Sequence, residues 1–230
     1  MNKKPVLLTE IAYAIGILTL AFGTALMERA DLGISMVVAP AYLIHLKVSQ
    51  ALPFYSFGMS EYVFQAALLI ALSLIARRFK RAYLFSFVTA VIYGFTLDLM
   101  MSLAAFIPMD ALAVRIAVYA AGFVICAVGV ALFFNAYIPP EAYELFVKEL
   151  SSMLGRDVSR VKTVYDIISC AVGVALSFIF FGLWRFEGVK LGTIICAILN
   201  GPLIGIVSKG LNSVFSFRDG LPKLKAFFEK

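Results

Sequence analysis

The sequence predicts an all-α polytopic membrane protein with about six membrane-spanning helices. Of its 230 residues, 62% are hydrophobic and only 15% are charged, and the mean hydropathy is +0.95. Soluble domains contain about half apolar and about a quarter charged residues, so this composition lies outside their range. The charges also gather in short clusters between apolar runs of the length that a helix needs to cross a bilayer. We therefore expect a single integral membrane domain, residues 1–230, whose surroundings are a lipid bilayer.

The apolar runs set the expected spans in order. They cover residues 10–27, 62–76, 83–105, 112–135, 163–184 and 191–209. The second run is the shortest, and the preceding "SFGMSEY" lengthens it.

Basic residues predict the orientation. They gather at the N-terminus, between the second and third spans, between the fourth and fifth spans, and in a basic amphipathic tail, 210–230. The alternate loops hold only Arg29, Lys47, Arg115, Arg185 and Lys190. This bias places both termini in the cytoplasm and the protein in the inner or plasma membrane. It also accounts for the net charge of +6, so no nucleic-acid partner is expected.

Two segments of the chain resemble each other. "FGTALMERADLGISMVVAPAYLI" (22–44) matches "VGVALFFNAYIPPEAYELFVKEL" (128–150), because each ends an apolar span with Gly-x-Ala-Leu and then breaks at Gly or Pro. The repeat halves are 10–110 and 111–209. Three spans in each half are an odd number, so the second half enters the membrane inverted, as in many secondary transporters. The breaks at 28–40 and 135–149 then become short re-entrant or interfacial helices on opposite sides.

Three blocks carry a family resemblance. "GTALMERADLGIS", "YGFTLDLMMSL" and "GTIICAILNGPLIG" resemble the recurrent blocks of the YczE/YitT-like bacterial integral membrane proteins. The resemblance covers nearly the whole chain and implies the same number of spans. "YIPPEAYE" in the second half departs from the Leu-Gly form of the first.

Polar residues inside the spans are the candidates for a substrate- or ion-binding site, because they are costly in lipid. Asp98 lies in the third span, with Ser102 one turn later, and Asn200 lies at a similar spacing in the sixth span. Gly201 and Pro202 interrupt that last span and would free backbone carbonyls beside Asn200. Each of these residues has a structural alternative, namely a hydrogen bond between packed helices.

Two further residues are candidates for the same cavity. Asp166 follows Lys162 by four residues, so an ion pair at the membrane edge is its favoured explanation. Gln65 in the second span is the approximate repeat counterpart of Asp166.

The cluster Glu28, Arg29, Asp31 and Gly33 has three interpretations. It is a simple outer loop, or a gate in which Arg29 forms a switchable ion pair with one acid, or unwound chain that lines the site. "ISMVVAPAYLIHL", which follows, is too short for a span and too apolar for a free loop. A re-entrant or interfacial helix fits it better.

Motifs of other functional classes are missing from the sequence. The three cysteines fall within apolar spans, and one histidine with scattered cysteines predicts no metal site and no cofactor. No Walker-type loop, GxSxG or HExxH is found, so we do not expect an enzyme.

A secondary transporter of a small solute or ion, with its site between spans three and six, is the leading functional hypothesis. A non-catalytic membrane scaffold, assembly or regulatory factor, docked to a membrane partner protein, is one alternative. The substrate-capturing subunit of an energy-coupling transport complex is another, and a homo-oligomer is compatible with all three.

Overall fold

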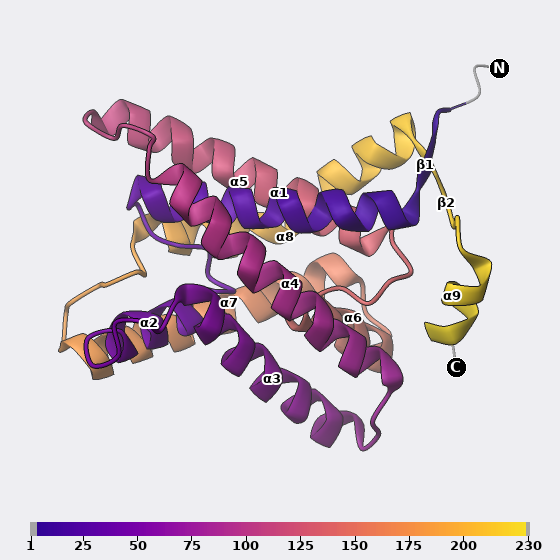
Figure 1. Ribbon diagram of the computed structural model, residues 1–230, viewed down its shortest axis with the longest axis horizontal. Helices are drawn as coiled ribbons and strands as arrows, with labels where there is room; N and C mark the ends of the chain where they lie inside the picture. The colour runs from indigo at the N-terminus through magenta and orange to yellow at the C-terminus, as the bar shows by residue number, and fades with distance from the viewer. Residues whose placement is uncertain (1–3, 229–230) are drawn as a thin grey trace.

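The structure is a computed structural model that describes residues 4–228 (Figure 1). Within this range it contains nine helices and two short strands: β1 (Val6–Leu8), α1 (Thr9–Ala30), α2 (Ala39–Val48), α3 (Phe57–Ala76), α4 (Arg81–Ala104), α5 (Leu112–Phe134), α6 (Ala142–Leu154), α7 (Val158–Phe181), α8 (Leu191–Val214), β2 (Ser216–Arg218) and α9 (Pro222–Phe228). Six of the helices, α1, α3, α4, α5, α7 and α8, are long and apolar enough to span a membrane. The predicted all-α polytopic class is confirmed.

Polar side chains cap the starts of two spans. The side chain of Ser56 accepts a hydrogen bond from the Met59 amide at 3.1 Å, so α3 begins at Phe57, and the predicted lengthening of this span by "SFGMSEY" is confirmed. Asp157 accepts one from the Arg160 amide at 3.2 Å, so α7 begins at Val158 instead of residue 163. These caps satisfy amides that a helix start leaves open.

The predicted interruption of the last span is wrong, because α8 continues through Pro202. Gly201 serves a close helix contact: a β-carbon there would lie 2.3 Å from Thr163 Oγ1 on α7. The Ser159 hydroxyl donates to the Gly201 carbonyl at 3.0 Å. Hydroxyl groups of a neighbouring helix commonly compensate backbone groups near a membrane proline in this way.

Helices α1 and α5 form the antiparallel centre of the fold. Gly23 on α1 meets Gly122 on α5, and Gly16 meets Gly129, so the order of contacts runs in opposite directions along the two helices. Small residues at such crossings let two backbones approach closely.

The two parts of the chain repeat one order of elements: a long helix, a short helix and two long helices, first in α1–α4 and then in α5–α8. Each short helix contacts long helices of both parts: α2 packs on α3 and α7, and α6 packs on α7 and α3. Hydroxyl groups hold the chain ahead of each short helix. Thr193 on α8 donates to the Ile34 carbonyl at 2.7 Å, and Ser86 on α4 donates to the Pro140 carbonyl at 2.6 Å.

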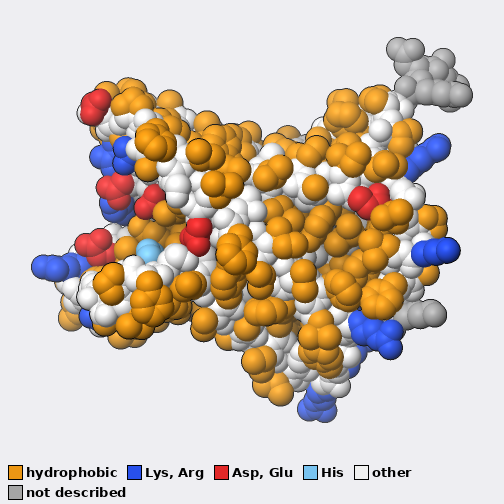
Figure 2. Space-filling model, viewed as in Figure 1, with side chains coloured by type: hydrophobic (Ala, Val, Ile, Leu, Met, Phe, Trp, Pro, Cys, Tyr) orange, Lys and Arg blue, Asp and Glu red, His pale blue; other side chains and the backbone are white. Residues whose placement is uncertain are grey.

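The surface is divided into an apolar middle and two charged ends. Hydrophobic side chains cover the middle of the face in Figure 2, and most charged side chains lie toward the two ends of its long axis. Large apolar side chains on the spanning helices are exposed, among them Ile70, Phe95, Leu99, Ile179 and Ile206. A lipid bilayer is the environment that matches such a belt.

The first and last described segments of the chain lie on one side of the molecule. β1 pairs in parallel with β2, and the Glu10 carboxylate accepts hydrogen bonds from the amides of Gly220 and Leu221. We call this side the terminus end, at the right of Figure 1, and the side that holds Asp31 the opposite end.

Candidate functional site

A buried polar cluster lies where α3, α6, α7 and α8 meet. Its members, which we call the central cluster, are at most 6% exposed: Glu61, Gln65, Glu141, Tyr143, Glu144, Lys162, Asp166 and Asn200. Buried charged groups are costly and persist only with partners, so their contacts decide what the cluster can do.

The α3 side of the cluster is organised by the Gln65 amide. Its nitrogen donates to Glu61 Oε2 and to Glu141 Oε2, both at 3.0 Å. Its oxygen accepts from the Ala142 amide at 2.9 Å, and the Tyr143 hydroxyl donates to Glu61 Oε2 at 2.9 Å. One amide thus joins two carboxyl groups to the start of α6.

The α7 side is organised by Lys162. Its ammonium lies 3.0 Å from Asp166 Oδ1 and 3.3 Å from Glu144 Oε1. Asn200 on α8 donates to Asp166 Oδ2 at 2.8 Å. The ion pair predicted from the four-residue spacing forms, but both side chains are at most 1% exposed, so it is buried and does not lie at an exposed edge.

A small cavity of about 20 Å³ lies beside these groups. Polar residues that line it include Ser35, Glu141, Glu144, Lys162 and Asn200. Its volume suits about one water molecule. Burial raises the pKa of Glu141 well above the usual carboxyl range, and Glu144 and Glu61 raise it further.

The chain from Ile34 to Leu43 is mostly buried, so it is not a surface loop. Ser35, Val37 and Val38 line the central cavity, and α2 then packs between helices of both parts of the chain. Gly33 allows the backbone to follow this path, because a residue with a side chain would be strained and would clash there. Its φ is 113°, and a β-carbon there would lie 2.5 Å from Thr193 Oγ1.

The predicted partners Asp98 and Asn200 belong to different hydrogen-bond networks. Asp98 accepts from the Ser56 hydroxyl at 2.7 Å and from the Gly58 amide at 3.0 Å, and so holds the start of α3. The exposed Ser102 hydroxyl donates to the Asp98 carbonyl within α4 at 2.9 Å. Of the five predicted binding residues, Gln65, Asp166 and Asn200 lie in the central cluster.

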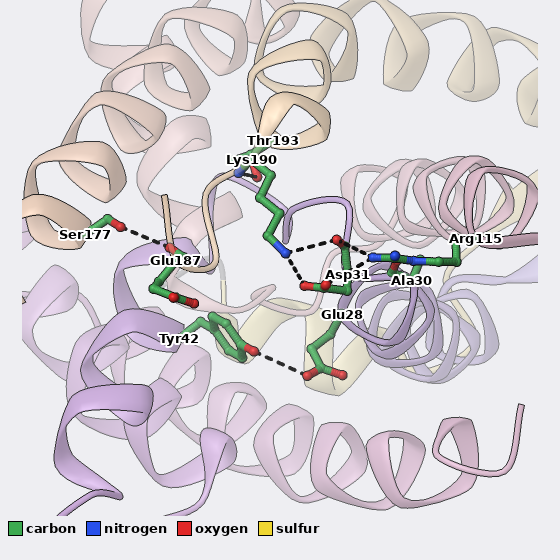
Figure 3. Close-up of polar contacts among 9 residues, drawn as sticks. All are labelled: Glu28, Ala30, Asp31, Tyr42, Arg115, Ser177, Glu187, Lys190 and Thr193. Atoms are coloured by element: carbon green, nitrogen blue, oxygen red, sulfur yellow. Dashed lines mark hydrogen bonds and ion pairs between the residues drawn. The ribbon is translucent and has the colours of Figure 1, made fainter. Parts of the chain in front are cut away.

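At the opposite end, Asp31 is held between two cations that reach it from different sides (Figure 3). Its carboxylate lies 3.0 Å from an Arg115 guanidinium nitrogen and also pairs with Lys190. Arg29, the predicted gate cation, instead donates twice to the Ile107 carbonyl. The acid of these ion pairs, Asp31, belongs to the predicted gate cluster, whereas the two cations were not predicted as gate residues.

A pocket of about 110 Å³ opens beside this group. Glu28, Asp31, Gly33, Tyr42 and Glu187 contribute to its lining. The Tyr42 hydroxyl donates to Glu28 Oε1 at 3.3 Å, as Figure 3 shows. Burial and the nearby Glu28 carboxylate raise the pKa of Tyr42, so it remains a neutral donor.

A larger pocket of about 310 Å³ reaches the cluster from α7 and α8 near the terminus end. Lys148, Lys162, Gly201, Ser208 and Lys209 are among its lining residues. Lys162 lines both this pocket and the central cavity.

Sequence reasoning missed Glu61, Glu141, Glu144 and Lys162 as site residues. Glu141 and Glu144 suit the first turns of an amphipathic helix, and Lys162 counts as a basic loop residue, so each has an ordinary explanation in the sequence. The sequence feature that could have identified the three acids is the presence of glutamates in "SEY" and "PPEAYE", next to apolar segments.

Comparisons with known proteins place the chain in a family. A search of curated proteins found no match, and neither did a search of solved structures. A family model matches residues 7–209, which is most of the chain. The protein therefore belongs to DUF6198, a family of unknown function.

Proposed function

We propose that this multi-pass membrane protein is a secondary transporter of a small solute or ion, and that it works by alternating access around the central cluster. One observation carries the proposal: Ser35, ahead of α2, and Glu141, ahead of α6, line the same closed cavity. Non-helical chain at membrane depth is tolerated where it is buried in protein or lines a cavity, and transporters build binding sites from it.

An inverted repeat is part of the proposal, and contacts across the two halves support it. The same sequence separation that relates Gly16 to Gly122 relates Gly23 to Gly129. Exchanging the halves therefore exchanges the contact of Gly23 with Gly122 for that of Gly16 with Gly129. Glu61 and Gln65 on α3 correspond to Lys162 and Asp166 on α7 at a separation five residues shorter, so this second correspondence includes a small shift of register.

In this proposal the terminus end is cytoplasmic, which the distribution of basic residues supports. The protein then lies in the inner or plasma membrane, with transport and not catalysis as its role. The three blocks that resemble YczE/YitT-like proteins support a relationship to that group. The Asp31 ion pairs close the outer side, and the pocket lined by Lys148 and Ser208 is the inner approach to the site.

Alternating access can be tested without knowing the substrate, by labelling single cysteines. Ser35→Cys reports access from outside, and Ser208→Cys reports access from inside. Asp31→Asn weakens both outer ion pairs, so it is expected to increase maleimide labelling at residue 35 and decrease it at residue 208. Labelling rates are measured in vesicles with a membrane-impermeant maleimide applied to each side.

The control is Asp110→Asn, which removes an exposed acid near the same end. It should change neither rate. The native cysteines are at most 8% exposed, and the chain without an added cysteine measures their background. Labelling that rises at residue 35 with no fall at residue 208 would contradict alternating access.

A further inference from the structure

Negative charge exceeds positive charge in the central cluster. The cluster contains four carboxyl groups, those of Glu61, Glu141, Glu144 and Asp166, and one ammonium, that of Lys162, which pairs with Glu144 and Asp166. All five residues are at most 2% exposed. Ionised groups in such an interior need partners, and a carboxylate without a cation is neutralised by protonation instead.

Hydrogen-bond donors are also too few for these oxygens. Glu61 Oε1 and Glu144 Oε2 are buried and accept no hydrogen bond, and Glu144 lines the cavity. The Gln65 amide nitrogen is divided between Glu61 and Glu141. Two buried carboxyl oxygens of the cluster thus have no donor, and one of them belongs to a residue that lines the cavity.

Glu141 is the carboxyl group with the weakest compensation. Lys162 pairs with Glu144 and Asp166, whereas Glu141 accepts a hydrogen bond from the Gln65 amide, which also donates to Glu61. No group of three or more acidic, histidine or cysteine side chains in residues 4–228 is arranged to hold a metal ion. A proton is the compensating species that needs no such arrangement.

We propose that the central cluster is a proton-binding site in which Glu141 holds a proton while the cavity is closed and releases it when the cavity opens. The proton adds to a carboxylate oxygen of Glu141 and is returned to water. Proton binding is inferred from the central cluster alone. The coupling of proton release to solute movement rests on the function proposed above.

Groups from every packed element bear on this titration. Burial raises the pKa of Glu141 and its acidic neighbours reinforce the shift. The titratable groups around it are Tyr13 on α1, Glu61 on α3, Tyr93 on α4, Cys126 on α5, Tyr143 and Glu144 on α6, and Lys162 on α7. Lys162 is the cation among them, and its two ion pairs are directed at other acids.

Lys162 also supplies a route for the proton. Its side chain lines both the central cavity and the pocket of about 310 Å³ on the α7 and α8 side. A movement of Lys162 away from Glu144 would connect the two spaces and admit water to Glu141. The released proton then leaves toward the terminus end.

Infrared titration of the purified full-length protein in lipid nanodiscs tests the proposal. A carboxylic C=O band should be present at neutral pH and disappear as the pH rises. Glu141→Gln should lose this band, whereas Glu149→Gln, which changes a carboxylate paired with Lys80, should keep it. Glu61→Gln should keep the band but lower its midpoint pH, because a neighbouring like charge is removed.

The spectrum of the unmodified protein is itself a test, so the proposal can be contradicted even if a variant does not fold. The absence of a carboxylic band at neutral pH would overturn the proposal. So would a band that survives Glu141→Gln in the folded protein, or one that sodium or ammonium chloride removes at constant pH, since the ligand would then be that cation. None of these outcomes affects the cysteine-labelling test, so failure of the proton-binding proposal and failure of the transport proposal can be distinguished.

Discussion

Gly23 on α1 and Gly122 on α5 lie in direct backbone contact. A β-carbon added at residue 23 would lie 2.6 Å from the Gly122 carbonyl oxygen and 2.6 Å from Cys126 Sγ. The neighbour on one side is backbone of a packed helix, so it cannot move aside without separating α1 from α5. This contact joins the two halves of the chain beside the central cavity.

Gly23→Ala should therefore destabilise the protein by about 1–3 kcal/mol, the usual cost of overpacking. Thermal unfolding in detergent measures it. Gly210→Ala is the matched control, since Gly210 also lies in a helix but has no atom within 4 Å of an added β-carbon. It should be neutral or slightly stabilising, and an equal loss in both variants would contradict the packing argument.

Lys162→Met should be strongly destabilising, by about 3–5 kcal/mol, because it leaves Glu144 and Asp166 buried without their cation. The loss should shrink as the pH falls, since protonation neutralises the remaining carboxylates. Unfolding at several pH values measures both effects. Lys80→Met breaks a more exposed pair with Glu149 and should cost at most about 1 kcal/mol.

Adding Asp166→Asn to Lys162→Met should recover part of the lost stability, because it removes one of the unpaired charges. Strict additivity of the two single changes would show that the ion pair contributes no coupling.

Asp98→Ala should lower stability by about 1–2 kcal/mol, because the start of α3 loses the acceptor for Ser56 and Gly58. Ser102→Ala, in the same helix, should have little effect, since its hydroxyl is exposed and bonds within its own helix. The labelling rates at residues 35 and 208 are expected to be unchanged in both variants. A changed ratio in a folded Asp98 variant would instead assign Asp98 to the transport cycle.

The tail should detach at acidic pH. Asp219 accepts from Lys225 at 2.9 Å and from Thr9 at 3.1 Å, and the bond from Lys225 in particular lowers the pKa of Asp219 below its ordinary value. A depressed carboxyl pKa contributes stability above the unfolded value and loses it as the pH falls through the folded value. Limited proteolysis of the tail should therefore accelerate only below the ordinary pKa of aspartate, and Asp219→Asn should show the fast rate at neutral pH. Equal rates in the two proteins would remove Asp219 from tail docking.

The spans were predictable because hydropathy over about 20 residues is a local property of the chain. The start of α7 was less so, because Asp157 lies in polar chain that hydropathy excludes. The buried path around Ser35 was suggested by its apolar sequence, but the cavity that it shares with Glu141 depends on the packing of both short helices.

The candidate site shows most clearly what could not be predicted from the sequence. Asp98 and Asn200 have similar spacing in their spans, yet Asn200 is buried against Asp166 while Asp98 is half-buried at the start of α3. Leu97, one residue earlier, is fully buried. One residue turns a side chain about 100° around a helix, so approximate repeat alignment cannot decide which residue faces the centre.

By itself, the sequence determined the membrane environment and the number of spans, because both follow from the composition of continuous segments. Only the tertiary structure decided that Glu61, Glu141, Lys162 and Asn200 share one interior. These residues are far apart in the chain, and each has an ordinary local explanation. Their charges carry a desolvation penalty only when packing removes all of them from water together. That penalty is what marks them as a candidate site.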